Sequence, residues 1–119
     1  MTPRFRLRAP QPSENDVEAG CLTILALHNY WVVRQHAGVW RSLDGKRYLH
    51  GVTKGTPDYA CLHGIHRNFL LEVKRPGGQL SLDQIAQIGL IELRYGLPIV
   101  VVKSPDELCE FLAKHEHSP

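Results

Sequence analysis

Residues 55–74 read GTPDYACLHGIHRNFLLEVK, and this stretch decides the fold. Two short runs of apolar and β-prone residues, 59–62 and 69–73, flank a segment that is rich in turn-forming and polar types. Strand-like runs separated by such a segment are typical of a β-hairpin. The stretch therefore predicts two antiparallel neighbouring strands near the middle of the chain.

The register of this hairpin decides which side chains meet. If the hairpin is centred near Ile65, Asp58 lies opposite Glu72. Directly opposed residues have Cβ atoms about 4.5–5.5 Å apart, so both carboxylates can reach one cation. Because side chains alternate between the two faces of a strand, Lys74 shares a face with Glu72, and Val73 points to the other face, toward the core.

Two carboxylates beside an ammonium suit a metal-dependent hydrolase. Mg²⁺ prefers oxygen ligands and is usually held by one or two carboxylates together with water and substrate phosphate. A nearby lysine can orient a nucleophile and neutralise developing negative charge. The alternative is an ordinary turn at residues 56–58 and a solvated strand face at Glu72 and Lys74, because short motifs often match by chance.

Several blocks of the chain together are more specific than the acidic pair. In order and spacing they resemble the VRR-NUC family of the PD-(D/E)XK nuclease superfamily, over about residues 13 to 112. The matching blocks are residues 13–18, 33–38, 55–58, 69–78, 79–84 and 96–104. The resemblance implies an α/β fold with a mixed central sheet flanked by helices.

The resemblance also implies an activity. It is that of a DNA endonuclease that uses Mg²⁺ or Mn²⁺ and acts on branched DNA, as a homodimer of the Holliday-junction-resolvase kind found as standalone bacterial or phage-type proteins. By the same resemblance Asp58 and Glu72 are metal ligands, the Val73 carbonyl is a third ligand, and Lys74 is the catalytic lysine. Rival interpretations are a noncatalytic DNA-binding module that keeps the fold and a small protein-interaction domain.

Helix residues complete the implied site. Gln84 resembles the family's helix glutamine, and Glu14 resembles the acidic residue of its first helix. Where the family commonly has glutamine one turn later, this chain has Glu18, and the sequence does not decide which acid reaches the metal. Gln84 also fits a capping box that begins at Ser81, and Glu14 fits the acidic first turn of a helix, so both have purely structural alternatives.

Basic residues gather in sequence around the candidate site. The net charge is only +2, so the overall charge is weak evidence for nucleic acid. The candidate DNA contacts are Arg34, Lys46, Arg47, Lys54, Arg67 and Arg75. A basic arm with three prolines covers residues 1–12, the nuclease-like domain covers 13–113, and a tail covers 114–119.

The rest of the chain alternates helix and strand patterns. Helices are expected at 14–28, at 82–95 with Ile85, Ile88 and Leu93 buried, and from 105 onward. Strands are expected at 31–34, 39–41, 47–49 and 99–102, the last buried on both faces. Trp31, Trp40 and Tyr48 are aromatic candidates for an interface or DNA contact, with core packing as the alternative.

Three widely spaced cysteines give neither a disulfide framework nor a zinc pattern, which favours a reducing, cytoplasmic location. Cys61, His63 and His66 lie close in sequence, but their spacing is poor for zinc. No apolar run is long enough for a membrane span, and the N-terminus lacks a signal-peptide pattern, so we expect no membrane association.

Overall fold

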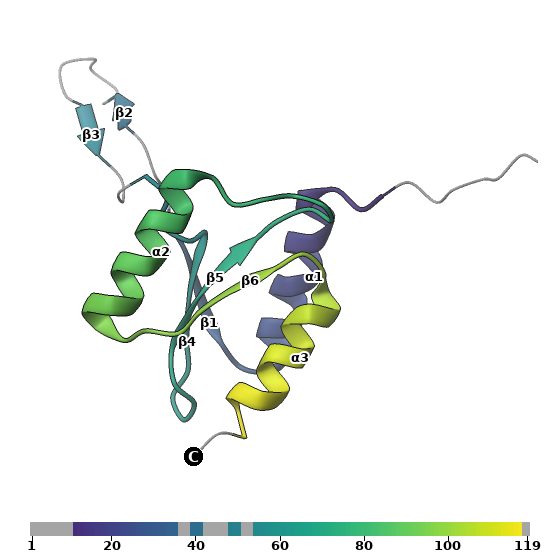
Figure 1. Cartoon of the computed structure of the whole chain (residues 1–119). Helices are drawn as coiled ribbons and strands as arrows, with labels where there is room; N and C mark the ends of the chain where they lie inside the picture. The colour runs from purple at the N-terminus through teal and green to yellow at the C-terminus, as the bar shows by residue number, and fades with distance from the viewer. Residues whose placement is uncertain (1–10, 36–38, 42–47, 51–53, 118–119) are drawn as a thin grey trace, which may run out of the picture.

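The computed structural model describes residues 11–117 apart from 36–38, 42–47 and 51–53. The fold is α/β, with a four-stranded mixed sheet and three helices, as the sequence predicts (Figure 1). In chain order the elements are α1 (Glu14–Leu27), β1 (Trp31–Arg34), β2 (Val39–Arg41), β3 (Tyr48–His50), β4 (Tyr59–Leu62), β5 (Phe69–Val73), α2 (Leu82–Tyr95), β6 (Ile99–Val102) and α3 (Pro105–His115).

The main sheet has the strand order β1-β4-β5-β6. Strand β5 pairs antiparallel with β4 and parallel with β6. Tyr59 lies opposite Leu71 and Ala60 lies opposite Leu70, which confirms the predicted hairpin register. One step further along the same ladder, Asp58 and Glu72 stand at neighbouring positions on one face.

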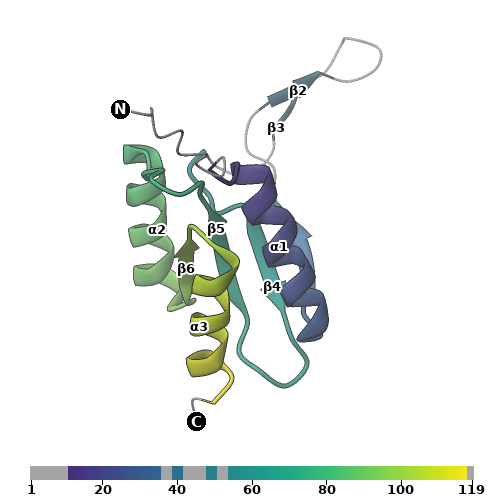
Figure 2. The same cartoon turned by 90° about the vertical axis from the view of Figure 1, so that its right-hand side faces the viewer.

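One face of the sheet is covered by α1 and α3, which pack against each other (Figure 2). This layer holds the hydrophobic core, because both helices turn an apolar side toward the alternate residues of β4 and β5. The core residues are Val17, Cys21, Leu25, Tyr30, Tyr59, Cys61, Phe69, Leu71, Val73, Val102, Leu108 and Leu112. None of the helices in the described part of the chain is long and apolar enough to cross a lipid bilayer.

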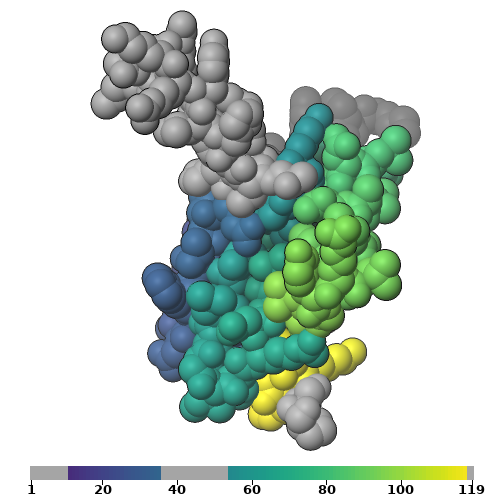
Figure 3. Space-filling model, turned by 90° about the vertical axis from the view of Figure 1, so that its left-hand side faces the viewer, coloured from purple at the N-terminus to yellow at the C-terminus, as the bar shows by residue number. Residues whose placement is uncertain are grey.

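Helix α2 lies on the opposite face of the sheet, and its limits match the prediction (Figure 1). Its predicted burial is wrong in part, since Ile85 is 54% exposed and Leu93 is 85% exposed, while Ile91 is buried. Apolar residues occur on more than one side of this helix, so periodicity alone did not identify the packed side. Figure 3 shows α2 in green beside the teal surface of the segment that holds β4 and β5.

Strand β6 forms where the sequence predicts it, but it is not buried on both faces. Val102 is fully buried against α3, whereas Ile99 and Val101, on the α2 face, are only partly covered. The physical reason is that β6 is an edge strand and that α2, the helix over its second face, leaves much of its own apolar surface in solvent.

The second sheet pairs β2 antiparallel with β3, with Val39 opposite His50. Strand β2 matches the prediction, and β3 begins and ends one residue later than expected. The candidate contacts Lys46 and Arg47 and the basic arm up to residue 10 lie outside the described residues.

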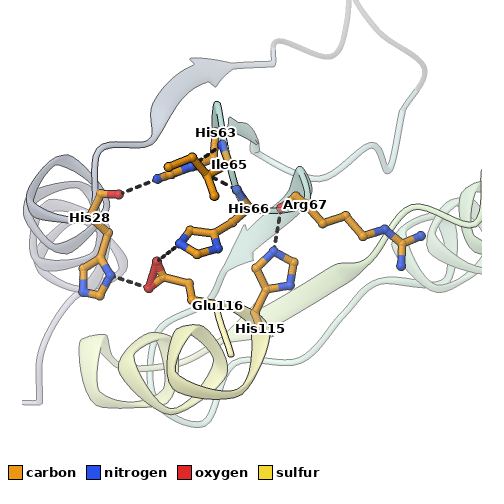
Figure 4. A network of polar contacts seen from close by, with 7 residues as sticks. All are labelled: His28, His63, Ile65, His66, Arg67, His115 and Glu116. Carbon is orange, nitrogen blue, oxygen red and sulfur yellow. Dashed lines mark hydrogen bonds and ion pairs between the residues drawn. The ribbon is translucent and has the colours of Figure 1, made fainter. Parts of the chain in front are cut away.

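Histidines at the far end of the sheet from Asp58 fix the end of α3 (Figure 4). The Glu116 carboxylate lies 2.5 Å from His28 Nδ1, at the end of α1, and 3.5 Å from His66 Nε2, in the turn between β4 and β5. Helix α3 itself runs to His115. Helix α3 therefore includes residues 114 and 115, the first two of the segment predicted as a tail, and the Glu116 contacts hold its last turn in place.

The hydrogen bonds of His63 in the same turn argue against the weak zinc interpretation. Its Nδ1 accepts the backbone N–H groups of Ile65 and His66, so Nε2 carries the proton and donates to the His28 carbonyl at 3.0 Å. Cys61 is fully buried in the core. Within the described residues no three histidine, cysteine or acidic side chains form a metal-binding group.

Candidate active site

The loop that carries Asp58 is held against the start of α2. Gly55 has φ +89°, and a Cβ atom at this position would lie 2.4 Å from the carbonyl oxygen of Asp83, so only glycine fits without a shift. Lys54 Nζ lies 3.2 Å from the Asp83 carboxylate, although both groups are well exposed. Pro57 is fully buried. These contacts fix the approach of the chain to Asp58.

Asp58 and Glu72 are linked by two hydrogen bonds, in which each carboxylate accepts a backbone N–H of the other segment. Glu72 Oε2 accepts the N–H of Asp58 at 3.1 Å, and Asp58 Oδ2 accepts the N–H of Val73 at 3.0 Å. Each carboxylate therefore lies over the neighbouring segment. The hairpin brings the two acids together, as the sequence predicts, and it places the Val73 backbone beside them.

Glu72 is the one charged residue among the buried residues of the described chain, with 2% of its surface exposed. Its Oε1 accepts a hydrogen bond of 2.8 Å from Gln84 Nε2 and lies 3.5 Å from Lys74 Nζ. The Lys74 side chain is itself mostly buried. Asp58, Glu72, Lys74 and Gln84 thus form one polar cluster, which we call the acidic cluster.

Gln84 caps the start of α2 and also contacts Glu72, while its role in a reaction stays a prediction. Its Oε1 accepts the N–H of Ser81 at 2.8 Å, and the Ser81 hydroxyl accepts the N–H of Gln84 at 3.1 Å, which completes a capping box at the start of α2. The other end of the same amide donates to Glu72. The cap therefore orients Gln84 toward the buried carboxylate.

The electrostatics of the acidic cluster suit a cation. Burial, followed by the nearby charge of Asp58, raises the pKa of Glu72 from 4.5 to about 7, and this outweighs the lowering effect of Lys74. A divalent ion between the two carboxylates would offset both causes. Two oxygen-donor side chains, with water and phosphate completing the shell, match the way proteins hold Mg²⁺.

The acidic residues of α1 are not part of this cluster. The Glu18 carboxylate accepts a hydrogen bond from the hydroxyl of Tyr59, whose side chain belongs to the core. Glu14 is exposed in the first turn of α1. Neither joins Asp58 and Glu72 in a group of three possible ligands within the described residues. Their role at a metal stays a prediction.

The candidate DNA contacts divide into two groups by position. Arg34 ends β1 opposite the core residue Tyr59, so it lies on the α1 face of the sheet and not on the face of Glu72. Arg75 directly follows Lys74, and both arginines are exposed. Lys54 lies on the loop that leads to Asp58. Arg67 precedes the other end of β5, where it donates to the Gly96 carbonyl. Arg67 is therefore not brought to the site.

Trp31 is 72% exposed, which rules out the core alternative for this residue. The side chains of Trp40 and Tyr48 lie outside the described part of the structure. Sequence reasoning missed Lys103, which lines a cavity together with Lys74. Its position directly after β6 could have drawn attention to Lys103. That position matters only because β6 pairs parallel with β5, and the sequence does not show this pairing.

No protein family, curated protein or solved structure matches this chain. The resemblance to the VRR-NUC family stays a prediction, and the site is interpreted from its own geometry.

Proposed function

We propose that this protein is a divalent-metal-dependent DNA endonuclease of the VRR-NUC type, acting on branched DNA. One observation carries the proposal: a buried glutamate with a pKa raised to about 7 lies beside an aspartate, a lysine and a glutamine in a single cluster. Buried acids with strongly perturbed pKa values concentrate at functional sites, because a stable core gains little from an uncompensated carboxylate pair.

Each residue of the acidic cluster has a role in this proposal. Asp58 and Glu72 would hold Mg²⁺ or Mn²⁺, which when bound supplies Lewis-acid stabilisation of negative charge on phosphate oxygens. Lys74 holds its ammonium beside Glu72, where it neutralises charge that develops on the attacked phosphate. Gln84 is a positioning residue, since it fixes the orientation of the Glu72 carboxylate through one hydrogen bond.

Exposed cations around the acidic cluster support a DNA substrate. Arg75 directly follows Lys74 and is exposed, and Lys54, which pairs with Asp83, is mostly exposed on the loop that leads to Asp58. Such side chains contact phosphates without reading sequence, which fits recognition of DNA shape.

The outer side of α2 supports a homodimer. The side of α2 that faces away from the buried Ile91 carries exposed apolar or small residues over about 100° of the helix circumference. Among them, Leu82 and Leu93 are 86% and 85% exposed. We call this surface the α2 stripe; it consists of Leu82, Ala86, Gly89, Leu90 and Leu93. Gly89 has open space around it, so a second helix can approach closely there.

The charges of α2 favour a second copy of the same helix as the partner. Its first turn is acidic through Asp83, and its last turn is basic through Arg94. If two copies of α2 pack antiparallel about a two-fold axis between residues 88 and 89, Asp83 faces the partner's Arg94. The symmetry then gives the same contact between Arg94 and the partner's Asp83. The surface is therefore complementary to itself in charge as well as apolar along its centre.

A cleavage assay tests the proposed activity. Labelled four-way junctions, flaps and linear duplexes are incubated with the wild-type protein in Mg²⁺, in Mn²⁺ and in chelator. We expect metal-dependent cutting, at least about 100-fold slower in Asp58→Asn and Lys74→Ala, with Asp106→Asn and Lys114→Ala as matched controls on α3. Absence of cutting of every shape by the wild type, or full activity in Asp58→Asn, contradicts the proposal.

The dimer has a separate test in sedimentation. Leu93→Asp is expected to shift the wild-type dimer to monomer without loss of folded stability, because the side chain is already 85% exposed. Leu27→Asp on α1, 76% exposed and away from the α2 stripe, is the matched control and should sediment as the wild type does. A wild type that stays monomeric at concentrations up to about 100 μM refutes the dimer, because homodimers normally have dissociation constants below this concentration.

A further inference from the structure

A cavity of about 430 Å³ lies next to the acidic cluster, on the side of β6. Its lining comes from the end of β5, the loop before α2, the first turns of α2 and the end of β6: Lys74, Gly78, Gln79, Leu80, Ile85, Val101 and Lys103. Cavities of a few hundred Å³ with an apolar lining and a few polar groups are typical of sites for small organic molecules. The catalytic candidate Lys74 is part of this wall, so the cavity and the cluster adjoin.

Two lysines stand side by side in this wall. Strands β5 and β6 run parallel with Val73 beside Val102, so the residues that follow, Lys74 and Lys103, lie next to each other on the face opposite the core. Neighbouring strands are about 4.8 Å apart. Lys74 is compensated by Glu72, but no acidic side chain of the described residues lies within ion-pair distance of the Lys103 ammonium.

This pair of like charges favours an anion between them. Lys103 is held in place at its backbone, where its N–H donates to Glu107 Oε2 at 2.7 Å. The lining also contains the apolar side chains of Leu80, Ile85 and Val101. An anionic end beside the lysines and an apolar body against these side chains describe a phosphorylated organic molecule, and the ammonium groups match phosphate as point charges.

We propose that the cavity binds one nucleotide unit, with its phosphate between Lys74 and Lys103 and its nucleoside against Leu80, Ile85 and Val101. This inference rests on the proposed nuclease function and names a subsite of it. Val101 lies beside Glu72 on β6, whereas Asp58 lies beside Glu72 on the β4 side. The cavity therefore lies beside the acidic cluster and not within it, so the nucleotide it binds is the one next to the phosphate that is cut. Lys103 then determines how the DNA strand lies across Lys74.

The test measures binding of a single nucleotide without divalent metal. Thymidine 5′-monophosphate is titrated into the full chain in chelator and followed by NMR shift changes, with thymidine and inorganic phosphate as separate arms. We expect a dissociation constant on the order of a millimolar for the nucleotide and weaker binding of either half alone. Lys103→Ala should weaken nucleotide binding about tenfold, and Lys114→Ala, the same charge change on α3, should leave it unchanged.

Two further variants keep the proposal falsifiable. Val101→Phe fills the cavity and should weaken thymidine and nucleotide alike, with circular dichroism to check folding. Asp106→Asn, on α3 and outside the cavity lining, should leave nucleotide binding intact. Equal affinity of the wild type and Lys103→Ala, or loss of binding in Asp106→Asn, overturns the nucleotide site. Lys103-dependent binding in a wild type that cuts no DNA would instead retain the site and refute the nuclease.

Discussion

Replacement of Glu72 by glutamine tests the electrostatics of the acidic cluster in the absence of metal. The glutamate is 2% exposed and beside Asp58, and its pKa is raised from 4.5 to about 7. Because the pKa of Glu72 is raised on folding, the folded protein binds more protons than the unfolded chain at pH values between about 4.5 and about 7. Its free energy of unfolding therefore falls as pH rises from about 4.5 to about 7, and is level on either side.

The size of this effect follows from the pKa values. A difference of one pKa unit corresponds to about 1.4 kcal/mol, so Glu72 costs the metal-free protein about 3 kcal/mol at pH 8 relative to pH 4. Glu72→Gln has no such charge to bury. We expect the difference in free energy of unfolding between Glu72→Gln and the wild type to move in favour of the variant by up to that amount as pH increases.

The assay is urea denaturation in chelator at pH 5, 6, 7 and 8. Taking the difference between the two proteins removes the contribution of groups that titrate in both. Glu110→Gln, at an exposed position on α3, is the matched control and should follow the wild type at every pH. A difference that is constant from pH 5 to pH 8, or that moves in favour of the wild type, refutes the reasoning.

Two further predictions concern the residues that support the acidic cluster. Gly55→Ala should lower the free energy of unfolding, measured by urea denaturation, by about 1–3 kcal/mol, because the new Cβ meets a backbone oxygen and φ is +89°. Gly64→Ala is the control, since a Cβ there would have nothing within 4 Å. A similar loss in Gly64→Ala would contradict the prediction. Gln84→Glu keeps a side chain that can cap the helix at Ser81 but places a third carboxylate against Glu72, so cleavage should fall about 10–100-fold with unchanged helix content by circular dichroism, and full activity would show that Gln84 only caps.

Local patterns were enough for the elements and for the acidic pair. Ser81 with Gln84 marks the start of α2, Gly96 marks its end, and the spacing around Ile65 sets the register that joins Asp58 to Glu72. Each of these depends on residues that are close in the chain, where backbone geometry leaves few choices.

Long-range packing was not available from the same patterns. Nothing in residues 99–102 says that they lie parallel to β5, so the pairing that sets Lys103 beside Lys74 had to come from the structure. Helix α2 has apolar residues on two sides, and only the fold shows that Ile91 is covered and Leu93 is not. The partner of Glu18 is likewise set by how α1 crosses the sheet, which brings it to Tyr59.

The central claim is that Asp58 and Glu72 hold one shared divalent cation, and a calorimetric titration with Mn²⁺ at pH 6.5 tests it most directly. We predict saturable binding by the wild type with release of protons, seen as a heat that depends on the buffer, because Glu72 must lose its proton to bind. Asp58→Asn should lose this binding. Absence of binding by the wild type, or equal binding by Asp58→Asn, would contradict the account.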